Sequence, residues 1–218
     1  MSPAVVIAID GPGASGKGTL ARRLAAHLGY VYLDTGAMYR AVALQVLLAG
    51  ADPADAQAAL AAAQKLDAGA LDDPQLRTDR VGQAASQVAA HGDVRQALMV
   101  FQRSFATNPP GNAPGAVLDG RDIGTVICPD AQVKLFVTAS PEARAHRRYL
   151  ELAARGEAAT EAEVLADLQT RDRRDQERAV APLRPAADAH LLDTTNLAID
   201  DAFAVALAAI SGKIVISG

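Results

Sequence analysis

The 218-residue sequence has no tryptophan, a single cysteine and an aromatic content of only 4%. A single cysteine excludes an intrachain disulfide and suits a reducing compartment such as the cytosol. Cys128 has no histidine near it to activate a thiol, so we interpret it as a small buried apolar residue. The scarcity of aromatics predicts a core built mainly from alanine, valine and leucine.

Long apolar runs are missing as well. No stretch reaches the ~20 apolar residues of a membrane span, and no basic residues precede the N-terminal apolar run, as they would in a signal peptide. The net charge of −4 argues against a nucleic-acid-binding protein, and the four histidines show no metal-ligand spacing. We therefore expect a cytoplasmic monomer that binds neither nucleic acid nor membranes.

The most informative stretch is 10–19, Asp-Gly-Pro-Gly-Ala-Ser-Gly-Lys-Gly-Thr. It follows an apolar run typical of a buried strand and precedes a segment of helical periodicity. This is the setting of a P-loop, in which backbone N–H groups and a helix N-terminus surround a polyphosphate while a lysine adds a full charge. The residues predicted to bind the nucleoside triphosphate are Gly11, Pro12, Gly13, Ala14, Ser15, Gly16, Lys17, Gly18 and Thr19.

The residue after the P-loop lysine narrows the class of protein. Most P-loops place a Ser or Thr there as a ligand of Mg²⁺. In this chain the position is Gly18, and the hydroxyl comes one residue later at Thr19. The Gly-Lys-Gly-Thr form resembles nucleoside-monophosphate kinases. It weakens a direct role for Thr19 in metal binding, so Thr19 is a secondary metal candidate.

Short apolar segments alternate with helical ones along the rest of the chain. This pattern predicts an α/β fold of the P-loop NTPase type, with a five-stranded parallel sheet flanked by helices. Strands are expected at 4–9, 30–33, 116–118, 133–137 and 191–194. Thr35 is expected to cap a helix over 37–48, and Asp52 a helix over 54–66. Residues 67–79 predict a loop or a rudimentary hairpin.

Acidic residues follow two of the predicted strands directly. In parallel sheets, ligands bind beyond the carboxyl ends of the strands, so the P-loop, Asp34 and Asp119 are expected around one crevice. Asp119 stands where a Walker-B-like acid would hold magnesium or its waters. The alternative is an aspartate that caps a loop, and we favour the metal role.

Arginines crowd the last third of the chain, where two helices are expected. Arg171, Arg174 and Arg178 share one helix face, which would lie over the phosphates of a bound nucleotide like a lid and neutralise their charge. The alternative is a solvated face with acid–arginine pairs. We favour the phosphate role for these three residues and the solvated face for Arg155 and Arg173.

Together these features resemble bacterial cytidylate kinases along essentially the whole chain. The P-loop is generic, and the specific matches are the segments 33–40, 84–90, 119–125, 144–148 and 171–183. The resemblance implies transfer of the γ-phosphoryl group of ATP, with Mg²⁺ as cofactor, to CMP or dCMP, giving ADP and CDP or dCDP.

The resemblance also implies roles for individual residues. The catalytic residues would be Lys17, Arg121 and Arg178, and Arg147 would join the ATP site. The substrate-binding residues would be Thr35, Arg40, Ser86, Arg95, Arg121, Asp122, Arg171, Asp175 and Arg178. A carboxylate such as Asp122 suits the cytosine amine, and an arginine suits the ring acceptors. No general base is named, because the attacking phosphate oxygen is already anionic.

The same resemblance divides the single domain 1–218 into three parts. The core would comprise 1–35, 115–145 and 180–212, the acceptor-binding insertion about 52–110, and a helical lid about 150–165. Two features depart from the family: residues 67–79 are too short and acidic for the small sheet of longer members, and Thr35 replaces a common serine but keeps the hydroxyl.

Two other functions were weighed. A kinase for another metabolite, such as dephospho-coenzyme A or shikimate, would usually carry Ser or Thr after the lysine and would leave Ser86, Arg95 and Asp122 without a role. A GTPase switch would need a guanine-reading Asn-Lys-x-Asp, which residues 194–197 do not supply. We rank the CMP kinase first, another pyrimidine or metabolite kinase second and the switch third.

Overall fold

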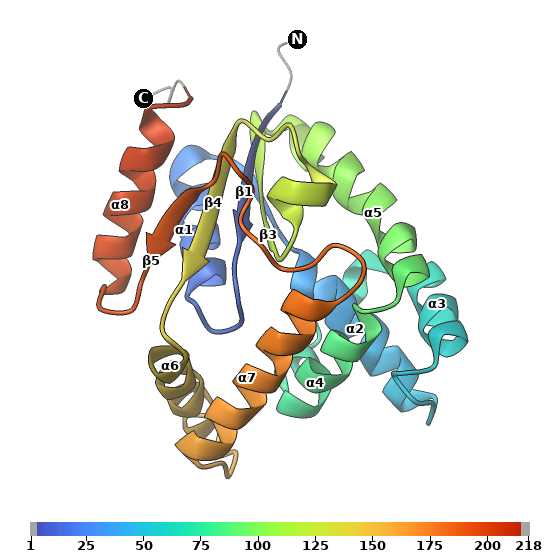
Figure 1. Cartoon of the computed structure of the whole chain (residues 1–218). Coiled ribbons are helices and arrows are strands. Elements are labelled where there is room, and N and C mark those ends of the chain that lie inside the picture. The colour runs from blue at the N-terminus through green and yellow to red at the C-terminus, as the bar shows by residue number, and fades with distance from the viewer. Residues whose placement is uncertain (1–3, 215–218) are drawn as a thin grey trace.

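A parallel five-stranded sheet lies at the centre of the computed structural model, which describes residues 4–214 (Figure 1). Residues 1–3 of the predicted core lie outside that range. The strands are β1 (Val5–Asp10), β2 (Val31–Asp34), β3 (Gly115–Gly120), β4 (Val133–Thr138) and β5 (His190–Asp193). Their spatial order is β2-β3-β1-β4-β5, and every neighbouring pair is parallel. The predicted α/β sheet is confirmed.

Helices cover both faces of this sheet. Their bounds are α1 (Lys17–Leu28), α2 (Thr35–Leu48), α3 (Ala56–Gln64), α4 (Asp79–Val88), α5 (Gly92–Thr107), α6 (Pro141–Ala153), α7 (Glu161–Glu177) and α8 (Ile199–Ser211). Alternate residues of β1 belong to opposite faces: Val6 and Ala8 pack with α2, α4 and α5, whereas Ile7 and Ile9 pack with α1 and α8. No helix within residues 4–214 is both long and apolar enough to cross a membrane.

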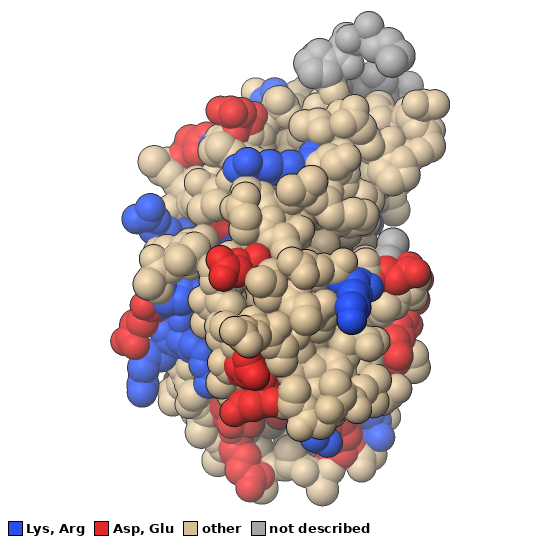
Figure 2. Space-filling view, turned by 90° about the vertical axis from the view of Figure 1, so that its right-hand side faces the viewer, with Lys and Arg blue, Asp and Glu red and all other residues tan. Residues whose placement is uncertain are grey.

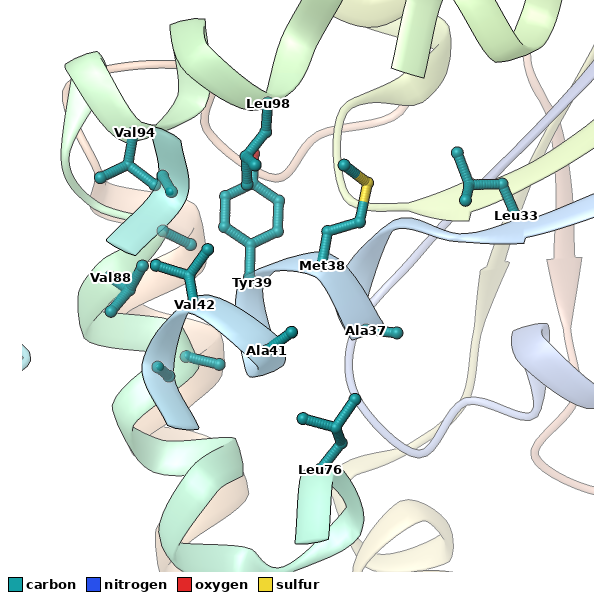
Figure 3. Close-up of a cluster of buried hydrophobic side chains, with 14 of the residues drawn as sticks. Leu33, Ala37, Met38, Tyr39, Ala41, Val42, Leu76, Val88, Val94 and Leu98 are labelled. Atoms are coloured by element: carbon teal, nitrogen blue, oxygen red, sulfur yellow. The ribbon is translucent and has the colours of Figure 1, made fainter. Parts of the chain in front are cut away.

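Helix α2 is the centre of the larger apolar cluster. Figure 3 shows Met38 and Val42 of α2 beside Val88 of α4 and Leu98 of α5, and all four side chains are buried. Core side chains of this kind pack closely and resist displacement. The packing therefore fixes the three helices that carry the predicted substrate residues against one face of the sheet.

Helices α6 and α7 lie beyond the carboxyl ends of the strands, below the sheet in Figure 1. A small apolar cluster joins them, formed by Ala145, Leu152, Val164 and Leu168. Helix α7 begins with a capping box, in which the Thr160 hydroxyl accepts the Glu163 backbone N–H and the Glu163 carboxylate accepts that of Thr160. The sequence pattern Thr160-Glu161-Ala162-Glu163 predicts a helix start at this point, and the structure confirms it.

Two predicted helix caps were wrong by one and three residues. Asp34, not Thr35, caps α2, because its Oδ1 accepts the Ala37 backbone N–H at 2.9 Å while the Thr35 side chain is bonded elsewhere. Asp55, not Asp52, caps α3, and Asp52 instead accepts the Ala54 N–H in the preceding turn. Each aspartate accepts backbone N–H groups two or three residues after it, so the aspartate directly before the first helical turn is the one that caps the helix.

Residues 67–79 were predicted to form a loop or a rudimentary hairpin, and the hairpin does not form. The segment folds as two short 3-10 turns, Ala68–Asp72 and Pro74–Arg77. Asp67 and Asp73 each cap one of them, accepting the backbone N–H two residues later at 2.7 and 2.8 Å. Aspartates that bond their own backbone favour turns over strand pairing, and the segment 67–79 contains no strand.

Candidate nucleotide-binding site

The P-loop joins β1 to α1 at the carboxyl end of the central strand. Gly11 has a φ of +151°, and a Cβ there would lie 1.9 Å from the Val137 carbonyl oxygen on β4, so only glycine fits. Gly16, with a φ of +85°, begins α1 in the left-handed conformation. Residues 13–19 line a cavity of about 480 Å³. The loop thus presents backbone N–H groups and a helix N-terminus to one cavity, an arrangement suited to phosphate.

Lys17 is the buried cation of this loop. Its side chain is 9% exposed, and Nζ donates to the Pro12 carbonyl at 3.3 Å. Burial lowers the pKa of Lys17 to about 8, and the nearby charge of Arg121 acts in the same direction. A phosphate anion in the cavity would oppose both effects because it supplies the missing negative charge.

The cavity is strongly cationic although the whole chain is acidic. Nine arginines and Lys17 line it, against the five carboxylates of Asp34, Asp119, Asp122, Glu151 and Asp175. The arginines come from every part of the chain: Arg22, Arg40, Arg77, Arg95, Arg121, Arg148, Arg155, Arg171 and Arg178. The excess of five positive groups suits a cavity that binds two ligands, each of which carries one or more phosphates.

Asp119 lies at the end of β3 beside the P-loop. Its Oδ2 accepts a hydrogen bond from the Tyr32 hydroxyl at 2.8 Å. Burial, and then the charge of Asp34, raise the pKa of the Asp119 carboxyl. A bound cation would oppose that shift. Within residues 4–214 no three His, Cys, Asp or Glu side chains gather as a metal cage.

Thr35 and Arg40 line the same cavity from the start of α2. The Thr35 hydroxyl donates to the Asp119 carbonyl at 2.7 Å, so its proton is already used and only its acceptor capacity remains. Arg40 pairs with Asp34 at 2.7 Å. The guanidinium keeps further N–H donors, and its Nε has no hydrogen-bond partner within the described chain.

Ser86, Arg95 and Asp122 come together from α4, α5 and the loop after β3. Arg95 and Asp122 form an ion pair with side-chain exposures of 4% and 6%, and Arg178 lies 3.6 Å from the other Asp122 oxygen. The buried Ser86 Oγ has no hydrogen-bond partner among the described residues. These three residues and Arg178 all line the cavity, where they form one polar cluster.

Helix α7 supplies the opposite wall. Arg121 donates from Nε to Asp175 at 2.9 Å, and both residues line the cavity with Arg171. Burial, and then the charge of Arg121, lower the pKa of Arg171. Arg174 does not line the cavity, unlike the other two arginines of its predicted face. The structure therefore brings two of those three arginines to the site.

Arg147 reaches the P-loop only through another residue. It donates to the hydroxyl and carbonyl of Thr194, at 3.0 and 2.5 Å, and the Thr194 hydroxyl donates to the Ser15 carbonyl at 2.9 Å. It does not line the cavity. Its contact with ATP stays a prediction, and its observed role is to support the P-loop from behind.

Arg155 is exposed, as expected for it, but it also reaches the site. It lines the cavity and donates to the Arg77 carbonyl at 2.8 Å. Arg148 of α6 also lines the cavity and lies 3.4 Å from the same carbonyl. The arginine cluster in the last third of the sequence was the signal for these cavity residues. Helix periodicity could not show that the turn between α6 and α7 lies against the insertion.

Asp10 is a structural link that the sequence did not reveal. Its two carboxylate oxygens accept the backbone N–H groups of Ile123 and Gly124, each at 2.8 Å. These residues directly follow Asp122 and begin a π-helical turn, Ile123–Ile127. Burial raises the pKa of Asp10 to about 6, against the opposing effect of the two N–H groups. One strand end thus fixes both the P-loop and the segment that carries Asp122.

Parallel strands flanking a P-loop strand place this chain among the P-loop nucleoside-triphosphate-binding proteins. A solved structure of similar fold, titled as an uncharacterized protein from Eubacterium ventriosum ATCC 27560, aligns over 95% of this chain and 98% of its own with a TM-score of 0.54. The sequence identity is 16%, so this likeness concerns the fold alone.

Sequence comparison identifies the particular family. The pattern of the family described as cytidylate kinase matches residues 7–211. The cytidylate kinase of Rhodospirillum rubrum is 58% identical over 96% of this chain and 98% of its own length. That of Paramagnetospirillum magneticum is 60% identical over 95% of this chain and 98% of its own. The chain belongs to the cytidylate kinase family, and the resemblance seen in its motifs is confirmed.

Proposed function

We propose that this chain transfers the γ-phosphoryl group of MgATP to CMP or dCMP and releases ADP and CDP or dCDP. The observation that carries the proposal is the buried group of Ser86, Arg95 and Asp122 in the same cavity that the P-loop lines. Phosphate transfer alone needs the P-loop and the arginines of this cavity, and the buried carboxylate, guanidinium and hydroxyl beside them suit a base with both donors and acceptors.

The three polar groups match the edge of cytosine. Its exocyclic amine is a donor, and its ring nitrogen and carbonyl are acceptors. Asp122 accepts from the amine, Arg95 donates to the ring acceptors, and the unpartnered Ser86 hydroxyl adds a further contact. The Arg95–Asp122 pair preorganises the recognition, because each member keeps unused hydrogen-bonding capacity after pairing.

The phosphate chemistry is divided among the surrounding cations. The loop residues and Lys17 hold the β- and γ-phosphates, while Arg40 faces the acceptor phosphate. An anionic oxygen of that phosphate forms the new P–O bond to the γ-phosphorus, and the bond to the bridging oxygen of ADP breaks. Arg121 and Arg178 neutralise charge that spreads over the transferred group. No proton needs to be removed.

Other residues bind the sugar and the metal ion. Arg171 and Asp175 contact the sugar hydroxyls of the acceptor. Mg²⁺ would screen the phosphate charges when bound with ATP, and Asp119, directly or through water, with Thr19 as a second candidate, would hold it. The carboxylate of Asp119 beside the P-loop suits a hard cation that keeps several of its waters.

The division into core, insertion and lid also belongs to this proposal. The hydrogen bond from Arg155 to the Arg77 carbonyl joins the proposed lid, about 150–165, to the proposed insertion, about 52–110. On the face in Figure 2, acidic side chains lie among the basic ones, in keeping with small anionic ligands and no nucleic acid. We keep the predictions of a monomer and of a cytoplasmic location.

Steady-state kinetics test the function. ADP release from MgATP is measured with CMP, dCMP, UMP, AMP and no acceptor, for the wild type, Asp122→Ala and the exposed control Asp130→Ala. We expect strong dependence on CMP and dCMP. Asp122→Ala should lower kcat/KM for CMP roughly 10- to 100-fold, because buried Arg95 loses its partner, while Asp130→Ala behaves as wild type. Equal rates with all acceptors, or turnover without one, would refute the proposal.

A further inference from the structure

We propose that Tyr32 is a positioning residue for Asp119, holding one carboxylate oxygen so that the other stays available to the metal ion of the bound nucleotide. The inference rests on the proposed function, because it takes Asp119 as the acid that holds Mg²⁺. It concerns a side chain outside the set of residues expected to contact substrates.

The sheet register places the phenol within reach of the carboxylate. On neighbouring parallel strands, Tyr32 of β2 stands opposite Val117 of β3, and Asp119 comes two residues later on the same face. Such diagonal neighbours are about 7–8 Å apart at their backbones, a gap that only a long or aromatic side chain bridges. The Tyr32 hydroxyl closes it with a hydrogen bond of 2.8 Å to Oδ2.

Gly18 lies close to the same oxygen. A Cβ at this position would lie 3.0 Å from Asp119 Oδ2 and 3.7 Å from the Tyr32 hydroxyl. A serine or threonine directly after the P-loop lysine would therefore press against the Asp119–Tyr32 pair. The absence of that hydroxyl from this P-loop thus has a physical reason: the space beside it is taken by a carboxylate whose orientation a neighbouring strand fixes.

The two oxygens of Asp119 are unequal as a result. Oδ2 is bonded to the phenol, whereas Oδ1 accepts no hydrogen bond from residues 4–214. The guanidinium of Arg22 lies over the Tyr32 ring, 5.5 Å from its centroid, and restrains the ring itself. A phenol has an ordinary pKa of about 10 and keeps its proton at neutral pH, so Tyr32 acts as a donor to a carboxylate that acts as a ligand.

Removing such an outer partner weakens metal binding more than nucleotide binding. Groups that orient a metal ligand are commonly worth about 10- to 100-fold in metal affinity. In Tyr32→Phe the ring and its contact with Arg22 remain while the hydroxyl is lost. The Asp119 side chain then rotates more freely, and ordering it costs part of the affinity gained from Mg²⁺.

Titration calorimetry tests the inference without turnover. The affinity for a non-hydrolysable ATP analogue is measured with Mg²⁺ and with a chelator, for the wild type, Tyr32→Phe, Asp119→Asn and the control Tyr30→Phe. Electron paramagnetic resonance of Mn²⁺ gives the bound metal directly. We expect Tyr32→Phe to lower the metal-dependent gain in affinity about 10-fold and to leave the metal-free affinity unchanged, while Tyr30→Phe matches the wild type.

The outcomes separate this inference from the function beneath it. The positioning role would be overturned if Mg²⁺ raised the affinity of Tyr32→Phe for the analogue within twofold of the wild-type gain. It would also be overturned if Tyr32→Phe lost equal affinity with and without metal. If Mg²⁺ raised the affinity of Asp119→Asn as much as that of the wild type, Asp119 would have no metal role and this inference would fail with it. Neither result affects the CMP dependence of ADP release by the wild type, which tests the kinase activity alone. Thermal melting of Tyr32→Phe verifies its fold.

Discussion

Lys17 shows how a binding site is prepared electrostatically before its ligand arrives. Its ammonium group is buried and hydrogen-bonded to a carbonyl oxygen, with no carboxylate in salt-bridge contact among the described residues. A buried cation without a counter-charge is unfavourable. We propose that a phosphate oxygen removes that cost on binding, so that part of the nucleotide affinity comes from the new counter-charge for Lys17.

This arrangement makes nucleotide binding dependent on pH. The pKa of Lys17 is lowered to about 8 by burial in the free protein, and bound phosphate restores the charged form. ATP affinity should therefore fall as the pH rises through about 8, with proton uptake on binding above it. Terminal phosphates titrate near pH 6 and do not interfere. Calorimetry in buffers of different ionisation enthalpy measures the uptake, and Lys17→Arg, which stays charged, should abolish it.

The pKa of Asp10 is raised, whereas that of Lys17 is lowered, and the raised pKa affects the stability of the fold. Its pKa is raised from 3.8 to about 6 by burial, so the folded state prefers the protonated form. The contribution of Asp10 to stability is then greatest below pH 3.8 and is lost as the pH rises through about 6. The rise in the pKa of Asp10 from 3.8 to about 6 corresponds to a free energy of about 3 kcal/mol.

The Asp10→Asn variant isolates this contribution from those of other carboxylates. The free energy of unfolding of the variant minus that of the wild type should increase between pH 4 and 6.5, by up to about 3 kcal/mol, and then level off. Urea titrations at a series of pH values provide the difference. A difference that is flat across this range would show that Asp10 does not titrate as proposed.

The position of a single residue in the site was predictable where a local sequence motif determines it. It was not predictable where the residue bonds to a partner far away in the sequence. The spacing around Lys17 was sufficient to place the P-loop. Asp10 lies 113 positions from Ile123, and no local pattern reports such a pair. Thr35 illustrates a further limit: the hydroxyl was expected to face the substrate, but the sequence could not show that its proton is given to the Asp119 carbonyl.

Arg144 is the point at which helices α6 and α7 are joined to the P-loop. It is 3% exposed and pairs with Asp172 of α7 at 2.6 Å. The same guanidinium donates to the carbonyls of Ala139 and Gly13 at 3.1 and 3.2 Å. One side chain therefore satisfies acceptors on the β4–α6 connection, on α7 and on the phosphate loop.

The Arg144→Ala variant should be strongly destabilised. Its loss leaves Asp172 and two carbonyls without their partner, and breaking a buried pair in this way costs about 3–5 kcal/mol. The free energy of unfolding from urea titration measures the loss. The exposed Arg173 lies on the same helix as Asp172, and Arg173→Ala should change the free energy by no more than about 0.5 kcal/mol. Equal values for both variants would contradict the linking role.

Helix boundaries were predictable where the cap is unambiguous. The Thr160–Glu163 box has one partner for each donor, and the structure matches it. Around α3, Asp52 and Asp55 offer similar carboxylates three residues apart, and local sequence cannot rank them. The sequence of residues 67–79 predicts a loop or a rudimentary hairpin, whereas in the structure Asp67 and Asp73 each cap a 3-10 turn.

The parallel sheet follows from the alternation of apolar segments and helices, but its order does not. Strands buried on both faces are near-continuous apolar runs, so they hold no information about which neighbour each one pairs with. The position of β3 between β2 and β1 decides the site, because it brings Asp119 next to the P-loop. That adjacency was expected only from the general rule that ligands bind at carboxyl strand ends.

Stability is distributed unevenly over the molecule. Both faces of the sheet rest on large apolar clusters, whereas α6 and α7 share a cluster of four buried residues and otherwise depend on ion pairs and hydrogen bonds. Segments with few buried apolar contacts open at lower free energy than the core. The region proposed to cover the phosphates is therefore the one least held by the hydrophobic core.

Hydrogen exchange should reveal this gradient. Amides of α7 near Val164 and of α6 near Leu152 should exchange through local opening, whereas those of β1 near Ile7 should exchange only on global unfolding. Adding MgADP together with CMP should slow exchange in α6 and α7 selectively, because we propose that Arg171 binds the sugar and Arg178 the phosphates. Either ligand alone should protect less, since each engages only part of the arginine set. Uniform protection along the chain would instead mean that the ligands stabilise the fold without ordering these two helices.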